Sequence, residues 1–306
     1  MPTGAARQPV PADQTMSDPI YFDSHMHTPL CHHAYGQPEE YAATAIGRGL
    51  RGIIVTCHAP LPEGMSPSVR MRRDQFDEYV ALVARATDAL TGQLEVKLGM
   101  ETDFVPGLET YIAELHARAP FHHCLGSIHY FTPEYRSACG TDDLKSFQLG
   151  YFENLARSAE TGLFDTLSHP DLIKNVSPDS WEFDEFREAI GAALDRIAAA
   201  GTAMELNTSG AHKSYPEMNP GPEMLRMMAD RGIPVVISSD SHLPERVGEG
   251  FETALESVAA AGFENVSYFH ERVRQEVPVA RVLASLRAPA ATEETPEAQN
   301  WLAQFR

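Results

Sequence analysis

The fold is decided by the stretch Pro19-Ile20-Tyr21-Phe22-Asp23-Ser24-His25-Met26-His27. Its apolar first half predicts a short buried strand, and the strand runs directly into two histidines. Side chains alternate between the two faces of a strand, so positions i and i+2 point the same way. His25 and His27 can therefore bind one metal ion together. An H-x-H pattern also arises by chance, and its interpretation depends on the rest of the chain.

The same pattern recurs along the chain: an apolar run is followed by a histidine, an acidic residue or an amide residue. Each run has the length and composition of a buried strand. The runs and the residues that follow them are Gly52–Cys57 with His58, Leu94–Met100 with Glu101, Cys124–Ile128 with His129, Phe164–Ser168 with His169, Thr202–Leu206 with Asn207, and Ile233–Ser239 with Asp240 and His242.

Helical stretches lie between these runs. We expect helices at about 38–49, 72–90, 108–118, 144–161, 183–200, 223–230 and 252–261. Strands that alternate with helices form parallel β/α units buried on both faces. Seven such units in succession favour an α/β fold that closes into a barrel, with functional groups at the carboxyl ends of the strands. We predict one domain over residues 18–288, a disordered N-terminal tail over 1–17 and a peripheral C-terminal tail over 289–306.

Composition limits the function classes. The chain has 306 residues and a net charge of −19, which argues against general nucleic-acid binding and is compatible with a cationic substrate. No apolar run approaches the roughly 20 residues that span a bilayer, and the first residues lack the apolar core of a secretion signal. The four scattered cysteines predict reduced thiols. We expect a cytoplasmic protein with no membrane or nucleic-acid partner, and a homo-oligomer is left open.

The residues at the strand ends predict a metal centre. Imidazoles and carboxylates together suit Zn, Fe or Mn, and they are too many for one ion. We therefore expect two or three divalent metal ions, with Glu101 and Asp240 as the candidate bridging carboxylates. Each residue alone has a simpler explanation, because a single histidine such as His58 or His169 is often only buried, Glu101 could cap a helix, and Asp240 could be an N-cap. The joint register with seven strand ends favours metal binding.

Other histidines lack this register. His32, His116, His122, His123 and His270 are expected to be surface residues or outer partners of the site. His33 is the exception, because its loop could fold back over the mouth of the barrel.

The motifs resemble those of the polymerase and histidinol phosphatase (PHP) family, and within it the histidinol-phosphatase branch. The matching segments are 23–28 with 31–33, 56–60, 99–104, 125–130, 162–174, 205–210 and 239–242, which together span about 20–250. The resemblance implies a distorted (β/α)7 barrel with three metals. It implies one metal held by His25, His27, Glu101 and Asp240, a second by His33, His58 and His242, and a third by Glu101, His129 and His169. The family pattern C-x-H selects His33 over His32.

The sequence departs from the family pattern around the phosphate-binding positions and before His58. Cys57 stands where relatives carry an acidic residue before the histidine. His212 and Lys213 replace a basic pair that begins with arginine, and Lys174 follows the fifth strand. We expect Lys174, Lys213 and His212 to bind the substrate phosphate, although solvated surface charge explains the lysines equally well.

Weaker candidates for substrate contacts lie elsewhere in the chain. Arg70, Arg72 and Arg73 are further candidates for the phosphate. Asp103 could contact a cationic part of the substrate.

The predicted reaction is hydrolysis of a phosphate monoester, whose dianion repels nucleophiles. Our hypothesis is that a metal-bridging hydroxide attacks phosphorus in line, with Glu101, Asp240 and His242 as catalytic residues. Asp240, His242 or a metal-bound water could manage the proton of the leaving alcohol. The resemblance implies L-histidinol phosphate as substrate and a role in histidine biosynthesis. The alternatives are a phosphoesterase that acts on a nucleotide or short oligonucleotide, and a non-catalytic metal-binding module.

Overall fold

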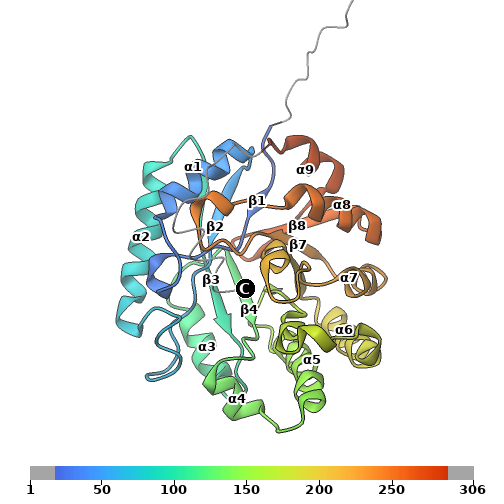
Figure 1. Ribbon diagram of the computed structural model, residues 1–306. Helices are drawn as coiled ribbons and strands as arrows, with labels where there is room; N and C mark the ends of the chain where they lie inside the picture. The colour runs from blue at the N-terminus through green and yellow to red at the C-terminus, as the bar shows by residue number, and fades with distance from the viewer. Residues whose placement is uncertain (1–17, 289–306) are drawn as a thin grey trace, which may run out of the picture.

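A computed structural model describes residues 18–288 of the chain (Figure 1). The two predicted tails, 1–17 and 289–306, lie outside the described residues. The domain boundary at each end therefore stays a prediction.

Seven parallel strands form one sheet in chain order and make a nearly closed barrel, which confirms the predicted α/β class. The first and last strands meet through backbone hydrogen bonds at their carboxyl ends, where His27 N donates to Ser241 O (2.9 Å) and Ser241 N donates to His25 O (3.0 Å). The strands are β1 Phe22–Asp23, β2 Gly52–Val55, β3 Glu95–Asp103, β4 His123–Ser127, β5 Thr166–Leu167, β6 Ala203–Asn207 and β7 Val235–Ser238.

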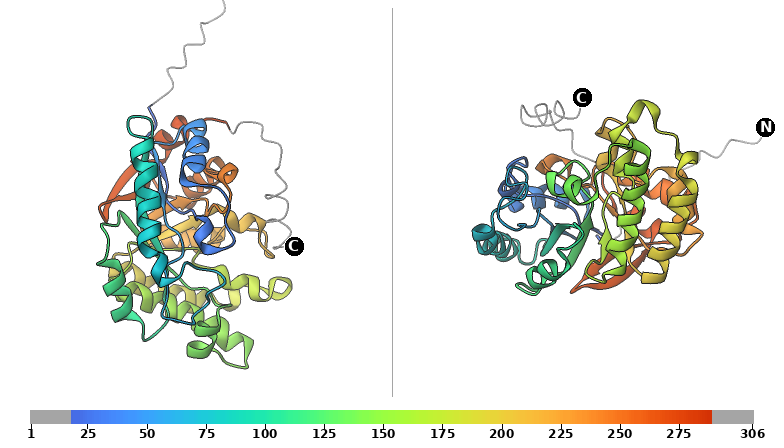
Figure 2. Two further views of the ribbon diagram at one scale, coloured as in Figure 1. Left: turned by 90° about the vertical axis from the view of Figure 1, so that its left-hand side faces the viewer. Right: turned by 90° about the horizontal axis from the view of Figure 1, so that it is seen from below.

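Helices surround the strands on the outside (Figures 1 and 2). Helix ends follow local chemistry: the first helix has Pro38 in its first turn, a capping box of Gln37 and Glu40, and Gly49 in the left-handed conformation (φ 72°) after its last residue. The helices are α1 Pro38–Arg48, α2 Phe76–Ala89, α3 Glu109–His116, α4 Pro133–Cys139, α5 Leu144–Glu160, α6 Arg187–Ala200, α7 Pro222–Ala229, α8 Phe251–Ala261 and α9 Val279–Ser285.

Most of the barrel strands are buried on both faces, which is why they are largely apolar in the sequence. Ile53, Ile54 and Val55 of β2 are each at most 1% exposed. Their side chains join those of the inner helix faces in one large apolar cluster. Among residues 18–288, no helix has the length and apolar character needed to cross a membrane.

Strand β3 changes partner halfway along its length. Residues 95–98 pair with β2, and residues 99–103 pair with β4. The change occurs at Gly99, where a Cβ atom would lie 2.6 Å from the Thr56 side chain and 2.8 Å from His123 O. This close approach requires glycine, and it brings Glu101, two residues later, to a bridge with His58. The predicted strand end at Met100 is wrong, because the strand continues to Asp103 and Glu101 lies within it.

The C-terminal part of the described chain contains elements that we did not predict. Strands β8 (Asn265–His270) and β9 (Val273–Pro278) form an antiparallel hairpin, and α9 follows it. Phe269 stacks on His123 at the start of β4 (4.8 Å), and Tyr268 packs on Phe22 (5.0 Å). The hairpin thus covers the amino-terminal end of the barrel.

Two histidines expected at the surface or at the edge of the site are instead buried in the barrel wall. His123 hydrogen-bonds Thr166 Oγ1 (2.8 Å), and His116 hydrogen-bonds Thr102 Oγ1 (3.0 Å). Both are less than 9% exposed. His123 stacks on Phe269 of the hairpin, and His116, the last residue of α3, packs against Phe164.

Candidate metal centre and active site

The nine residues predicted as metal ligands lie together at the carboxyl end of the barrel. They come from β3 and from the segments that follow β1, β2, β4, β5 and β7. Six of them line a cavity of about 380 Å³, namely His33, His58, His129, His169, Asp240 and His242. The other three, His25, His27 and Glu101, are at most 1% exposed and contact members of the first group.

Glu101 is the centre of this cluster. Its two carboxylate oxygens face five imidazole nitrogens that come from four different segments. The distances are 2.7 Å from Oε2 to His58 Nδ1, 3.7 Å from Oε2 to His27 Nε2, and 3.2, 3.5 and 3.6 Å from Oε1 to Nε2 of His169, His25 and His129. One carboxylate placed among so many imidazoles has the position of a residue that bridges cations.

Asp240 is a second carboxylate in the cluster. Its Oδ1 lies 3.1 Å from His27 Nε2 and 3.5 Å from His25 Nε2. Its Oδ2 accepts hydrogen bonds from Asn207 Nδ2 (3.2 Å) and Ser209 Oγ (3.1 Å). One oxygen is therefore fixed by the strand β6 segment and the other is turned to the histidines.

The loop that carries His33 folds back over the mouth, as expected. His33 Nδ1 contacts Cys31 O at 2.7 Å, so this nitrogen donates and Nε2 is left as the acceptor that can bind a metal. The His33 ring lies 4.7 Å from the ring of His242 and 5.3 Å from that of His58.

The protonation states differ between members of the cluster. Burial opposes ionisation of Glu101 and Asp240, yet the neighbouring histidines hold both carboxyl pKa values well below their ordinary values. Burial and the neighbouring imidazoles lower the pKa of His33 to about 3 and that of His242 well below its ordinary value. Carboxylates that stay ionised and imidazoles that stay neutral are the forms in which these groups bind metals. Although burial opposes protonation, the neighbouring carboxylates raise the pKa of His27 to about 9 and also raise those of His25 and His129, so a cation bound there would displace their protons.

Two further carboxylates hold imidazole rings from outside the cluster. Glu205 Oε1 accepts from His25 Nδ1 (2.7 Å), and its Oε2 accepts from the backbone N of His169 (2.7 Å). Asp103 Oδ1 accepts from His129 Nδ1 (2.9 Å). These bonds fix the tautomer of each ring so that Nε2 faces the centre.

His169 and Asp240 adopt left-handed backbone conformations, with φ of 30° and 50°. Such conformations are uncommon for residues other than glycine and cost of order 1–3 kcal/mol each. Each residue lies two positions after a strand and turns its side chain into the cluster. Strain at two positions of one cluster is typical of a functional site.

The donor set fits divalent metal ions. His25 Nε2, His58 Nδ1 and Glu101 Oε2 are buried without a hydrogen-bond partner, although the last two are only 2.7 Å apart. Groups whose ligand atoms all lie within 4.8 Å of one another include His25, His27 and Asp240, then His27, His58 and His242, and also His58, Glu101 and His129. Nitrogen and oxygen atoms that converge without satisfying one another are what a metal site requires.

Of the predicted phosphate-binding residues Lys174, Lys213 and His212, only Lys213 lines the cavity. The weaker candidate Arg70 lines it as well, as do Tyr130 and Phe131. The assignment of Lys174 is wrong, because this side chain is fully buried and its Nζ donates to Asp171 (3.0 Å), Glu217 (2.9 Å) and Met218 O (2.9 Å).

His212 and Asp103 are also corrected. His212 does not line the cavity, and its Nε2 lies 3.3 Å from Glu249. Asp103 cannot contact substrate directly, because it is 1% exposed and bonded to Arg70 (2.8 Å) and His129.

Sequence reasoning missed Glu205 as part of the site. In the run 202–206, the pattern of strand ends points only to Asn207, the residue that follows the run. Glu205 lies two positions earlier, so its side chain points to the same side of the strand as that of Asn207. An acidic residue inside an otherwise apolar strand is the signal that could have identified it.

Comparisons with known proteins agree with this geometry. The family model described as PHP domain matches residues 23–209. A Deinococcus radiodurans protein named "Probable histidinol-phosphatase" is 35% identical over 258 residues, which cover 82% of this chain and 98% of that protein. The histidinol-phosphatase of Bacillus subtilis is 26% identical over 265 residues, and the match covers 76% of this chain and 98% of that protein.

Solved structures show the same fold. A histidinol phosphate phosphatase of Lactococcus lactis, complexed with Zn, L-histidinol and phosphate, superposes with a TM-score of 0.70 at 20% identity. The match covers 83% of this chain and 98% of that one.

Proposed function

The chain belongs to the PHP family, and from this premise we propose that it is a metal-dependent phosphatase that hydrolyses L-histidinol phosphate to L-histidinol and phosphate. The observation that carries the proposal is the convergence of Glu101, Asp240 and the histidines on one cavity. The relatives that match over nearly their whole length are named for this activity. The Lactococcus lactis enzyme was solved with both products of the reaction and with Zn.

We propose that two or three divalent ions bind the cluster. The proposed ligands are His25, His27, His33, His58, Glu101, His129, His169, Asp240 and His242, with Glu101 between the ions. Bound divalent ions would supply positive charge for the phosphate oxygens and would lower the pKa of a coordinated water. Zn is the metal in the Lactococcus lactis enzyme, and Fe or Mn suit the same donors.

The side chains of the cavity wall bind and orient the substrate. Arg70 and Lys213 provide positive charge at the wall, suited to a phosphate dianion. Tyr130, Phe131 and Leu172 form an apolar side that suits an imidazole ring. Asp240 and His242 belong to the cluster and line the cavity. Because both are in their proton-free forms, a coordinated water would be the better source of the proton that the leaving alkoxide needs.

The proposal includes coarser expectations that follow from the function. A small phosphate ester is the substrate, with no nucleic-acid partner, and the protein acts in the cytoplasm. Assembly into a homo-oligomer stays open.

A substrate panel with elemental analysis of the same sample tests the proposal. We expect protein purified without chelator to contain divalent metal and to hydrolyse histidinol phosphate with a higher kcat/KM than nucleoside monophosphates or a short oligonucleotide. His129→Ala and Asp240→Asn should lower kcat by two or more orders of magnitude. Preference for nucleotides would favour the alternative substrate, and full metal content without any phosphatase activity would indicate a binding module.

A further inference from the structure

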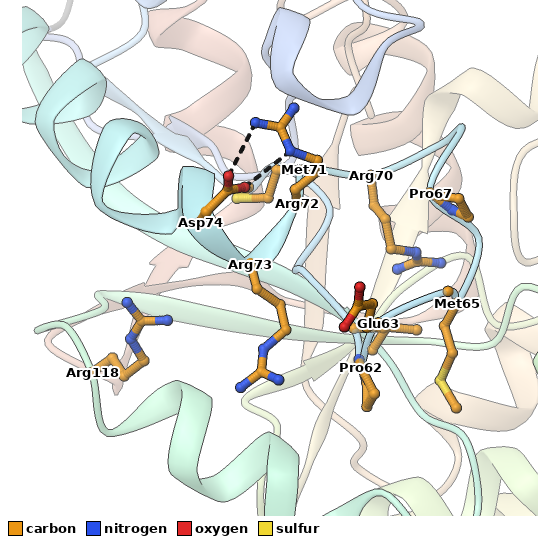
Figure 3. A pocket seen from close by; sticks show the side chains of 12 residues that line it. Pro62, Glu63, Met65, Pro67, Arg70, Met71, Arg72, Arg73, Asp74 and Arg118 are labelled. Carbon is orange, nitrogen blue, oxygen red and sulfur yellow. Dashed lines mark hydrogen bonds and ion pairs between the residues drawn. The ribbon is translucent and has the colours of Figure 1, made fainter.

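A second cavity lies beside the active-site cavity and has a different chemistry. It has a volume of about 620 Å³, and it is formed by the loop between β2 and α2 together with Arg118, which follows α3 (Figure 3). Four arginines and two acidic residues line it, namely Arg70, Arg72, Arg73, Arg118, Glu63 and Asp74. The chain as a whole carries a net charge of −19, so a locally basic cavity is an exception on this molecule.

Arg73 is the cation in this cavity that protein carboxylates do not neutralise. Within residues 18–288 it makes no ion pair, and its guanidinium lies over the ring of Tyr111 at 5.5 Å. The Tyr111 hydroxyl donates to Pro60 O (2.9 Å), which fixes the ring. In Figure 3, Arg72 turns to Asp74, whereas Arg73 points away from that pair. A cation held over a fixed ring is already positioned for an anion.

Arg118 is the second available cation. Its guanidinium stacks on the ring of Phe76 at 3.9 Å, and its Nη2 lies 3.0 Å from Asp77. This ion pair is exposed, with Asp77 87% and Arg118 42% accessible, so it contributes only about 0–1 kcal/mol. Arg118 can therefore exchange this carboxylate for a more highly charged anion at little cost.

Arg70 connects the two cavities. It lines both of them, is 2% exposed, and donates through Nη2 to Asp103 Oδ2 (2.8 Å). Asp103 in turn holds His129 at the metal centre. Arg70 thus separates an anion in the second cavity from the cluster of histidines and carboxylates.

We propose that this cavity is a second phosphate-binding site, formed by Arg73 and Arg118 and separated from the active centre by Arg70. Planar guanidinium groups bind phosphate oxygens in pairs, which favours an oxyanion over other ligands. The choice of phosphate rests on the proposed function, because substrate and product of that reaction both carry this group. Leu61 and Met71 are the buried apolar residues of the cavity lining.

Titration calorimetry with inorganic phosphate on the metal-containing protein tests the site. The double variant Arg73→Gln, Arg118→Gln should bind one phosphate fewer per chain, or bind it about tenfold more weakly. Both side chains are exposed, so the variant should fold. Arg187→Gln is the matched control, because it removes an exposed arginine paired with Asp184 outside both cavities and should change nothing. Unchanged stoichiometry and affinity in the double variant would overturn the proposal.

Kinetics then distinguishes the two sources of phosphate. If the site receives substrate before it reaches the metals, the double variant lowers kcat/KM several-fold at low salt and leaves kcat unchanged. If it receives released phosphate, kcat/KM is unchanged and the non-competitive part of phosphate inhibition is lost. The titration itself needs no turnover, so it remains decisive even if histidinol phosphate proves not to be the substrate.

Discussion

Glu205 and Asp103 do not line the cavity, yet each holds an imidazole of the cluster at 2.7–2.9 Å. Both are at most 1% exposed and have no solvent to stabilise their charge. Their retention in the core is explained by the orientation they impose on His25 and His129. The residues of this site therefore have two roles. Some face the position of the proposed ions, and others, such as Glu205 and Asp103, orient the side chains that do so.

Glu205→Gln tests the outer layer. The substitution keeps the size of the side chain and removes the negative charge that accepts from His25 Nδ1 and His169 N. We expect metal affinity to fall about 10- to 100-fold, with a parallel loss of activity at limiting metal. Chelator competition and elemental analysis measure this change. Glu223→Gln, at an exposed site in α7, should retain full metal content. Retention of wild-type affinity by Glu205→Gln would exclude the role assigned here.

Phe131 is an exposed aromatic residue at the cavity, 51% accessible, and its ring lies 5.4 Å from that of His129. On the proposed function it packs against the imidazole of the substrate. Phe131→Ala should raise KM for histidinol phosphate about 3- to 10-fold and leave kcat nearly unchanged. Steady-state kinetics with β-glycerophosphate, which has no ring, provides the comparison. An equal effect on both substrates would argue against a ring contact.

Secondary-structure elements were predictable where burial on both faces leaves a clear pattern. β2 and β7 are nearly continuous apolar runs, and β2, β4, β6 and β7 each lie inside or within one residue of their predicted ranges. The hairpin β8–β9 was missed because β9 is mostly exposed and mixes charged with apolar residues. The ligand positions were predictable for the same reason as the strands, since a polar residue after a buried run is conspicuous.

Residues whose role depends on a loop were not predictable. Lys174 resembles a phosphate ligand in sequence, but the segment that contains Glu217 and Met218 closes over it and takes all its donors. No short-range pattern encodes that closure. Arg70 is buried, whereas Arg72 and Arg73 of the same loop are exposed, because Arg70 bonds to Asp103 of β3. This contact between distant segments was not predictable either.

Gly99 is the position where an element's geometry and the site depend on one another. Gly99→Ala places a Cβ atom against Thr56 and His123 O, so β3 must shift, and Glu101 shifts with it. We expect a loss of about 1–3 kcal/mol in the free energy of unfolding and a reduced metal content. Urea denaturation and elemental analysis check both.

The control is Gly47→Ala in α1, where a Cβ atom would have no neighbour within 4 Å. This change should be neutral or should stabilise the protein by up to about 1 kcal/mol. If Gly99→Ala behaved like Gly47→Ala, the close approach at β3 would not constrain the strand.

Considered as a whole, the molecule has a metal cluster at one end of the barrel and a sealed end at the other. Two histidines away from the cluster are buried, namely His123 at the start of β4, against the hairpin, and His116, the last residue of α3. Burial lowers the pKa of His116 to about 4 and that of His123 to about 3. Each must pick up a proton when the chain unfolds in mild acid, so the stability of the whole barrel depends on pH independently of catalysis.

The sign of this dependence follows from linkage. A histidine whose pKa is lower in the folded state than in the unfolded state binds fewer protons when folded, so the free energy of unfolding falls as pH falls below about 6.5 and levels off only below the folded pKa. For His116 the window is about pH 6.5 to 4, and the loss is of the order of 2–3 kcal/mol. His116→Gln can keep a hydrogen bond to Thr102 Oγ1 and cannot titrate. Urea denaturation of both proteins at pH 7.5 and 5, at equal metal loading, should show a smaller drop in the variant. His270→Gln, at an exposed site in β8, should follow the wild type. Equal drops in all three proteins would mean that His116 is protonated in the native barrel.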